Sequence, residues 1–243
     1  MARYHCMEIP VNKYPNFIPR FMKRYITYFE RAVNEFESFD EKNKKYVQEA
    51  ITLKPLEEYQ KLIKLLDQSS SPVVFCHNDV QECNLLIKTP SDPSADTTDI
   101  MLIDYEYSYF GKRGHDIGNH FCEWVMQNIA DTPLGYDYDI DCYPSHEEQL
   151  RFATEYLKCV SEELKDAPES KREKYLVSPE QLIKEANEHS LMSHLYWGLW
   201  GFAQFFLSKI DFDFLSYSLC RLRIYYHFKQ KYYPQEMQSN KIS

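Results

Sequence analysis

Apolar residues recur every three or four positions along most of the chain, which is the spacing of amphipathic helices. The clearest case is residues 16–39, where Phe and Tyr side chains repeat on one face. The same spacing predicts helices over residues 1–7, 40–53, 55–66, 147–163, 179–207 (in one or two pieces) and 217–232. The pattern therefore predicts a mainly helical molecule.

Short apolar runs interrupt this pattern and predict strands near residues 73–76, 85–87 and 100–103. The polar segments 89–99 and 131–144 predict loops, and the charged residues 165–174 predict a surface connection. Neither a repeat nor a long linker divides the sequence. We therefore expect one α+β domain over residues 1–243, mainly helical, with a small β-hairpin.

Acidic and amide residues follow two of the predicted strands. Asp79 and Asn84 come after the first strand, and Asp104 and Glu106 come after the third. Phosphoryl-transfer sites use such a set: one Asp orients the attacking hydroxyl, while an Asn and a second Asp hold Mg²⁺ on the nucleotide phosphates. The alternative is a pair of strand-end turns, where Asn and Asp are common. The order of the groups and the strand–loop–strand context favour the phosphoryl-transfer site.

Other polar residues lie beside these acids in the sequence. His77 is expected to orient the loop that carries Asp79 through hydrogen bonds. Asp116 and Asn119 are expected to cap a helix that starts near residue 117, and a buried Asp116 could also support the His77–Asp79 loop. We favour structural support as the role of Asp116. Glu123 lies further along the same helix, where its carboxylate could face a cleft.

Residues 191–207 are strongly apolar and aromatic. The run is shorter than the ~20 residues of a membrane span and contains His194 and Gln204, so we expect a core helix and no membrane span. Trp197 and Trp200, three residues apart, share one face of this helix. From the spacing alone, core packing is the favoured role. The alternative is a cage that holds a quaternary ammonium group by cation–π attraction of about 0.5–2 kcal/mol for each ring.

Composition narrows the possible partners and the cellular location. The formal net charge of -9 argues against a general nucleic-acid binder. The 7 cysteines form no paired framework, and the first residues lack the apolar core of a signal peptide, so we expect reduced thiols and a cytoplasmic protein. Gly111 is the first glycine of the chain, which leaves no glycine-rich phosphate loop before the acidic cluster.

Four long motifs resemble the choline/ethanolamine kinases, which are related to the aminoglycoside phosphotransferases and have a protein-kinase-like fold. The motifs are VVFCHNDVQECNLL (73–86), LIDYEYSYF (102–110), RGHDIGNHFCEW (113–124) and SHLYWGLWGFAQ (193–204). The resemblance covers about residues 2–226. It matches the family just past the hinge between the two lobes, so it implies a C-terminal lobe alone. The N-terminal β-lobe, with the loop and lysine that hold the ATP phosphates, is expected to be absent.

Two places resemble the choline branch of the family. Gln81 and Glu82 follow the His-Asn-Asp motif, and Cys122–Trp124 read Cys-Glu-Trp. We therefore favour a choline kinase, with an ethanolamine kinase or a dual-specificity enzyme as the alternative. One position departs from the family, because Asn128 stands where a pocket tyrosine is expected.

The resemblance also implies roles for individual residues. Asp79 would be the catalytic base with Gln81 near the substrate hydroxyl, and Asn84 and Asp104 would be the magnesium ligands. His77, Glu106 and Asp116 would support this catalytic and metal loop at 73–124. A helical region at 179–233 would complete a choline pocket formed by Tyr107, Glu123, Trp197, Trp200, Phe212 and Tyr217. On this basis the cage becomes the favoured role of the two tryptophans.

The implied activity is phosphorylation of choline to phosphocholine with ATP and Mg²⁺, which feeds phosphatidylcholine synthesis. A second hypothesis is an inactive lobe that binds choline or regulates a kinase. The resemblance also implies a homodimer, or a heterodimer with a full-length kinase.

Overall fold

The computed structural model describes residues 1–88, 99–129, 132 and 134–233. Helix α8 (Pro179–Leu207) is one unbroken helix at the centre of the molecule. Its middle is buried on all sides and mainly apolar, and such a helix is stable only when it is surrounded by other elements. The helices that pack on it are α2 (Phe17–Asn34), α4 (Pro55–Asp67), α5 (Arg113–Glu123), α6 (His146–Glu163) and α9 (Phe214–Tyr232).

The other α-helices of the described residues are α1 (Ala2–Cys6), α3 (Glu41–Thr52) and α7 (Glu169–Tyr175). Helix α1 lies against α6, and α3 packs on α9. The Asp40 side chain caps α3 by accepting a hydrogen bond from the backbone N–H of Asn43. Helix α7 lies in the predicted surface connection. The helices predicted from apolar spacing are therefore present, with ends shifted by a few residues.

The strands form antiparallel pairs. Strand β1 (Val73–Cys76) pairs with β4 (Tyr109–Lys112), β2 (Leu85–Lys88) with β3 (Asp99–Leu102), and β5 (Met126–Asn128) with β6 (Tyr136–Tyr138). Within the described residues no larger sheet occurs. The fold prediction of a mainly helical lobe with a small hairpin at the catalytic loop is thus confirmed.

Two predictions for local structure are wrong. The segment 131–144, expected to be a loop, contains β6, which is held by pairing with β5. Helix α5 begins at Arg113, so Asp116 and Asn119 lie inside the helix and do not cap it. Both side chains are fully buried and bond to residues from other elements, and such contacts are not visible in local sequence. Most of the loop predicted at 89–99 lies outside the described residues.

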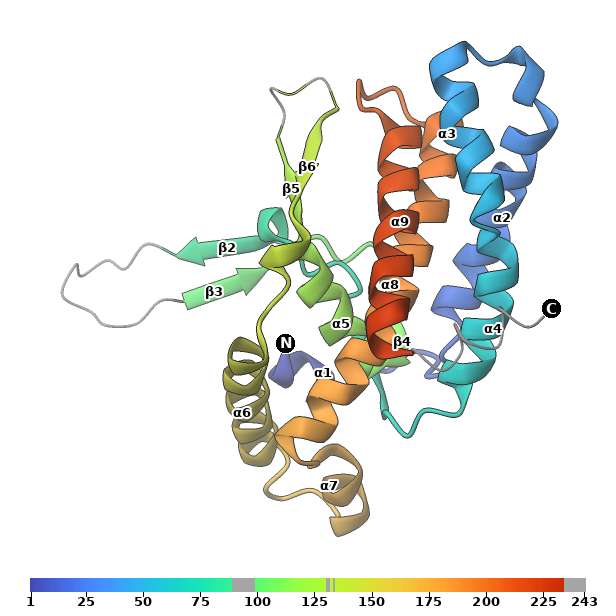
Figure 1. Cartoon of the computed structure of the whole chain (residues 1–243). Helices are drawn as coiled ribbons and strands as arrows, with labels where there is room; N and C mark the ends of the chain where they lie inside the picture. Colours follow the sequence, from blue (N-terminus) through green and yellow to red (C-terminus); the bar gives the residue numbers. More distant parts are fainter. Residues whose placement is uncertain (89–98, 130–131, 133, 234–243) are drawn as a thin grey trace.

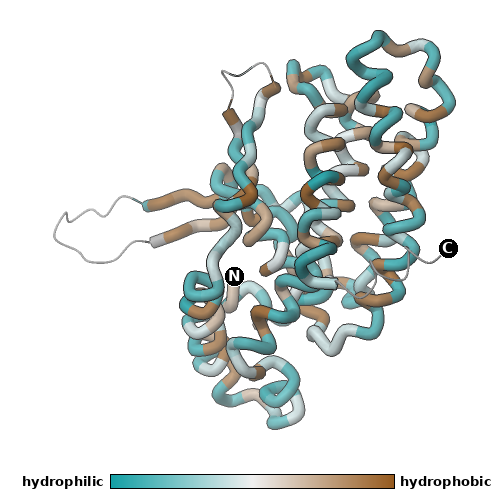
Figure 2. Tube along the Cα trace, in the orientation of Figure 1, coloured by the Kyte–Doolittle hydropathy of each residue, from teal (hydrophilic) through white to brown (hydrophobic). Residues whose placement is uncertain are grey.

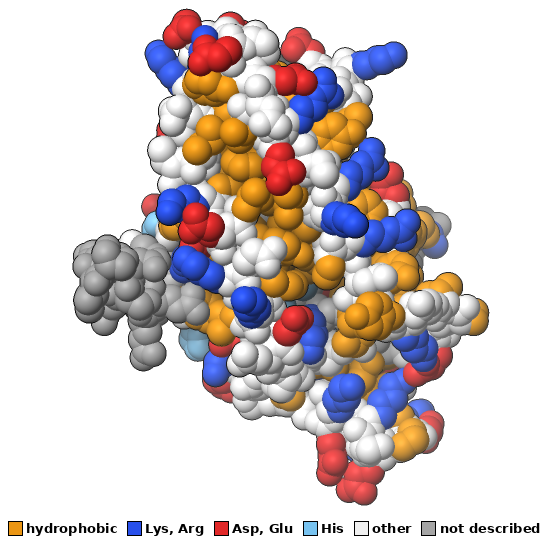
Figure 3. Space-filling model, turned by 90° about the vertical axis from the view of Figure 1, so that its right-hand side faces the viewer, with side chains coloured by type: hydrophobic (Ala, Val, Ile, Leu, Met, Phe, Trp, Pro, Cys, Tyr) orange, Lys and Arg blue, Asp and Glu red, His pale blue; other side chains and the backbone are white. Residues whose placement is uncertain are grey.

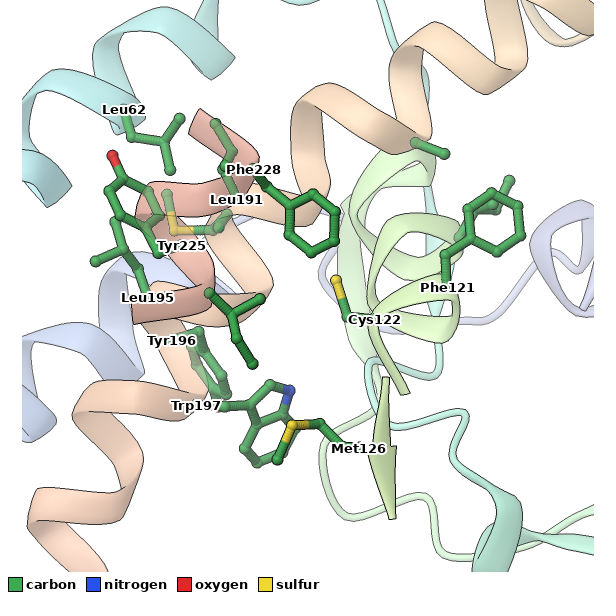
Figure 4. Packing of buried hydrophobic residues seen from close by; sticks show 14 of the residues in the cluster. Leu62, Phe121, Cys122, Met126, Leu191, Leu195, Tyr196, Trp197, Tyr225 and Phe228 are labelled. Carbon is green, nitrogen blue, oxygen red and sulfur yellow. The ribbon is translucent and has the colours of Figure 1, made fainter. Parts of the chain in front are cut away.

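The main core forms where α5, α8 and α9 meet. Figure 4 shows Leu191 of α8 close to Phe228 of α9, with Cys122 of α5 on the other side of the Phe228 ring. Trp197 lies beside Met126 at the edge of this core. Three helices from distant parts of the sequence thereby bring rigid side chains to one place.

Apolar side chains also reach the surface in two regions. The β2–β3 hairpin extends from the body of the molecule with apolar residues on both strands (Figure 2), and Ile87 is 70% exposed. A second region lies on the side that carries α2, α3 and α4 (Figure 3), over a groove lined by Phe29, Val33, Ile51 and Leu56. Among the described helices, each is too short or too polar to cross a membrane.

Candidate active site

One cavity of about 330 Å³ lies between the catalytic loop and the α8–α9 helices. It is lined by both predicted catalytic residues, one predicted metal ligand and the whole predicted substrate pocket. These residues are Asp79, Gln81, Asp104, Glu106, Tyr107, Glu123, Trp197, Trp200, Phe212 and Tyr217. The chain thus brings acidic side chains, mostly from loops, and aromatic side chains, mostly from α8 and α9, around one cavity.

The loop that carries Asp79 is held in place by Asp116 of α5. The Asp116 carboxylate accepts hydrogen bonds from the backbone N–H of His77 (2.9 Å) and of Asn78 (2.6 Å). Asn78 has φ 64°, a left-handed conformation that Asn tolerates better than most residues. Its side-chain amide donates to the Tyr107 carbonyl over 2.9 Å. Because the backbone N–H and the side-chain amide of Asn78 are both hydrogen-bonded, the orientation of the neighbouring Asp79 is well defined.

Asp116 remains an anion although it is fully buried. Burial alone would raise the pKa of Asp116, but hydrogen bonds from His5 and from the two loop amides outweigh burial and lower it to about 2. His5 Nε2 lies 2.8 Å from Asp116 Oδ2, and its Nδ1 lies 2.7 Å from the Tyr156 hydroxyl. Burial lowers the pKa of His5, and the hydrogen bond and negative charge of Asp116 oppose this shift.

Asp79 projects into the cavity beside Asn84. The Asn84 amide donates to Asp79 Oδ2 and to the Asp79 carbonyl, each over 2.9 Å. Burial raises the pKa of Asp79 to about 7, helped by the negative charge of Glu123 and, less strongly, of Asp104, while the Asn84 hydrogen bond opposes the rise. A carboxyl group with a pKa near neutrality is suited to accept a proton from a substrate hydroxyl.

Asp104 follows β3 and reaches the same space. Its backbone has φ 63°, and strain of this kind in a non-glycine residue is common at functional sites. The preceding residue, Ile103, donates its N–H to the Asn84 carbonyl over 3.0 Å and accepts from His77 Nε2 over 3.0 Å. His77 therefore joins the two acid-bearing loops to each other.

These loops offer the oxygen ligands that Mg²⁺ prefers. The nitrogen of the Asn84 amide is occupied by Asp79, which leaves the amide oxygen for a cation. Asp104 adds an exposed carboxylate at the rim of the same cavity. Glu106 also lines the cavity. The donor set therefore fits a hard divalent cation.

The aromatic part of the cavity is built from rings that meet nearly at right angles. The Trp197 and Trp200 rings lie 5.4 Å apart at 80°, Tyr107 and Trp197 5.4 Å apart at 75°, and Trp200 and Tyr217 6.0 Å apart at 73°. Phe212 lies 5.6 Å from Tyr217. Both indole N–H groups are engaged, by Asn119 and by the Tyr107 hydroxyl, so the faces of the rings remain for apolar or cationic contact.

A buried ion pair forms one wall of the cavity. Arg221 Nη2 donates to Glu123 Oε1 over 2.7 Å, and Arg221 Nε donates to the Tyr217 hydroxyl over 2.9 Å. The guanidinium also lies 5.3 Å from the Tyr217 ring centre. Burial alone would lower the pKa of Arg221, but Glu123 outweighs it and raises this pKa, so the residue is a fixed cation.

A sequence model described as choline/ethanolamine kinase matches residues 1–226. The chain belongs to the choline/ethanolamine kinase family. It is 40% identical over 231 residues to a mouse choline/ethanolamine kinase, covering 95% of this chain and 55% of that relative. It is 34% identical over 231 residues to mouse choline kinase alpha, covering 95% of this chain and 49% of the relative. The chain therefore spans about half the length of these relatives.

The fold agrees with that family. A choline kinase from Cryptosporidium parvum superposes with a TM-score of 0.64, at 24% sequence identity, over 97% of this chain and 64% of the other. The protein-kinase-like lobe expected from the motifs is therefore present.

Several residues that line the cavity were not predicted from the sequence. Arg221 was not predicted, although it lies four residues after Tyr217 on α9, a spacing that places both on one helix face. Asn119, which lies outside the cavity lining but accepts the indole N–H of Trp197, was predicted only as a helix cap. The remaining unpredicted lining residues are Met126, Gln204, Ser208, Ile210 and Phe214. The side chain of Asn128, predicted to alter the pocket wall, lies outside the described part of the structure.

Proposed function

We propose that this chain contributes the catalytic loop, metal ligands and alcohol pocket of a choline kinase, which transfers the γ-phosphoryl group of ATP to the hydroxyl of choline. The observation that carries the proposal is the joint lining of one cavity by Asp79 and the aromatic rings. A proton acceptor and a cation cage on one small space suit a substrate that carries a hydroxyl and a quaternary ammonium close together. Choline has this form.

The proposed chemistry begins at Asp79. Its carboxylate, held by Asn84, accepts the hydroxyl proton of choline as the oxygen bonds to the γ-phosphorus. The bond from that phosphorus to the bridging oxygen breaks, and the electron pair leaves with ADP. Mg²⁺ held by Asn84 and Asp104 would neutralise the phosphate charge during transfer. Gln81 lines the cavity and is proposed to lie near the substrate hydroxyl.

The cage is proposed to orient the other end of the substrate. Trp197, Trp200 and Tyr107 present ring faces, and Tyr217 and Phe212 close the space. Holding both ends of a small substrate lowers the entropic cost of reaching the reactive geometry. The product would be phosphocholine, formed in the cytoplasm and feeding phosphatidylcholine synthesis. Ethanolamine is the alternative substrate, and a dimer with itself or with a full-length kinase is also part of this proposal.

A second candidate is a choline-binding or regulatory lobe without turnover of its own. One observation favours it. Among the described residues that line the cavity, Arg221 is the only cation, and Glu123 already pairs with it. Phosphoryl transfer depends on cationic groups that clamp the phosphates, so this chain would need such groups from elsewhere.

The test is to incubate the purified chain with ATP, Mg²⁺ and choline and to follow phosphocholine by mass spectrometry. Turnover that falls at least about 100-fold in Asp79→Asn, but not in the exposed control Asp166→Asn, supports the kinase. Choline binding by calorimetry without turnover supports the second candidate. Neither turnover nor binding contradicts both.

A further inference from the structure

Arg221, the one cation among the described residues that line the cavity, lies beside the proposed substrate cage. Arg221 is 1% exposed and contacts both the acid and an aromatic wall of the cavity through Glu123 and Tyr217. Its remaining nitrogen, Nη1, is buried and has no hydrogen-bond partner among the described residues. A fully buried guanidinium with one orphan donor is costly to retain, which indicates a role beyond packing.

Resting on the proposed function, we propose that the Arg221–Glu123 pair sets the preference of the cavity for N-methylated ammonium groups over primary ones. The pair does so by engaging Oε1 of Glu123 and by offsetting the charge that the carboxylate would present to the substrate. Oε1 of Glu123 accepts a hydrogen bond from the guanidinium at 2.7 Å, and the positive charge of Arg221 partly offsets the negative charge of the carboxylate.

The two amines differ in what they need from the cavity. A primary ammonium has three N–H donors, and each donor loses free energy if it is buried without an acceptor. A trimethylammonium has none, and ring faces hold it well. Besides Glu123, the other carboxylates on the cavity belong to Asp79, Asp104 and Glu106, from the loops at which we place the hydroxyl and the metal. With Glu123 paired to Arg221, the other acceptors beside the rings are neutral ones such as Gln204 and Ser208, so the aromatic part favours the cation that needs no charged acceptor.

Removing the guanidinium should reverse this preference. In Arg221→Met the Oε1 atom of Glu123 loses its partner and becomes available, and the negative charge of the carboxylate is no longer offset. Choline gains only charge attraction, whereas ethanolamine gains charge attraction and hydrogen bonds. We expect the ratio of the dissociation constants of ethanolamine and choline to fall about tenfold, since a hydrogen bond to a charged group accounts for a difference of that size.

The experiment is calorimetric titration of choline and of ethanolamine into the wild-type chain and its variants. Arg223→Met is the matched control, because Arg223 is also on α9 and pairs with a glutamate, Glu49, but lies outside the cavity lining. The control should keep the wild-type ratio. In Arg221→Met/Glu123→Gln the ratio should return toward the wild-type value, because the freed carboxylate is gone.

An unchanged ratio in folded Arg221→Met overturns the inference while leaving the proposed function intact. Wild-type chain that binds neither amine overturns both. If Arg221→Met does not fold, Glu123→Gln alone decides. The inference requires that in Glu123→Gln the affinity for ethanolamine falls no more than the affinity for choline, because Glu123 is not the hydrogen-bond acceptor of ethanolamine in the wild type. A larger loss for ethanolamine contradicts the inference.

Discussion

The indole nitrogen of Trp197 donates a hydrogen bond of 2.8 Å to Oδ1 of Asn119. The same Asn119 oxygen accepts from Ser193, and its amide nitrogen donates to the Asn78 carbonyl in the loop that carries Asp79. One buried amide on α5 thus connects the aromatic cage with the catalytic loop. The distance between the two halves of the proposed site depends on this side chain.

Replacing Asn119 should therefore destabilise the protein. Asn119→Ala leaves three buried polar groups without their partner, and each unsatisfied group costs about 1–3 kcal/mol. We expect the free energy of unfolding, measured by urea titration, to fall by about 3 kcal/mol or more. The control is Asn34→Ala at the exposed end of α2, which should change it by less than about 0.5 kcal/mol. Equal small effects in both would show that the network contributes little.

Gly118 should not tolerate a side chain. A Cβ added there would lie 2.3 Å from the backbone oxygen of Ala186 on α8 and 2.9 Å from the Ser190 nitrogen. Neither backbone atom can move without separating α5 from α8, so Gly118→Ala should cost about 1–3 kcal/mol or more. Gly111→Ala is the control, because its Cβ would make an ordinary contact of 3.4 Å with Cys76 Sγ. Thermal unfolding of both variants checks the prediction, which fails if they melt together.

Trp200 should matter more for choline than for ethanolamine. Trp200→Ala removes a ring face from the cavity, and cation–π attraction to a desolvated quaternary ammonium is about 0.5–2 kcal/mol. We expect weaker choline binding by that amount and a smaller loss for ethanolamine, both measured by calorimetry. Equal losses would mean that Trp200 only packs. Trp124→Ala is a useful comparison, since that ring lies outside the cavity lining.

Stability should fall between pH 7 and pH 5.5 because of buried histidines. Burial lowers the pKa of His115 to about 4, whereas an unfolded histidine titrates near 6.5. Below pH 6.5 the His115 side chain binds more protons in the unfolded chain than in the folded one, so acid favours unfolding through this residue. His115 alone should contribute about 1 kcal/mol of this loss.

The measurement for His115 is urea unfolding at the two pH values. His115→Gln should lose less stability than the wild type over this interval, even if it is less stable at both values. The exposed control His146→Gln should lose as much stability over this pH interval as the wild type. If His115→Gln loses as much unfolding free energy between the two pH values as the wild type does, His115 is not a source of the pH dependence.

The helices were predictable because their apolar spacing is a local property. Residues 55–66 and 147–163 were placed within a residue or two of α4 and α6. The short strand β6 was not, because its stability comes from pairing with β5 and not from its own polar sequence. Asp116 and Asn119 were placed at a helix start for a similar reason, since the partners that bury them lie on distant segments.

The sequence by itself determined the family, through four motifs, and the kinds of residue available for chemistry at Asp79, Asn84 and Asp104. Only the tertiary structure decided how these residues act on one another. The pKa of Asp79 near 7 arises from burial and from Glu123, 44 residues away in the sequence. The pairing of Glu123 with Arg221 spans 98 residues. Burial and charge depend on distance in space, and packing of α5, α8 and α9 sets those distances.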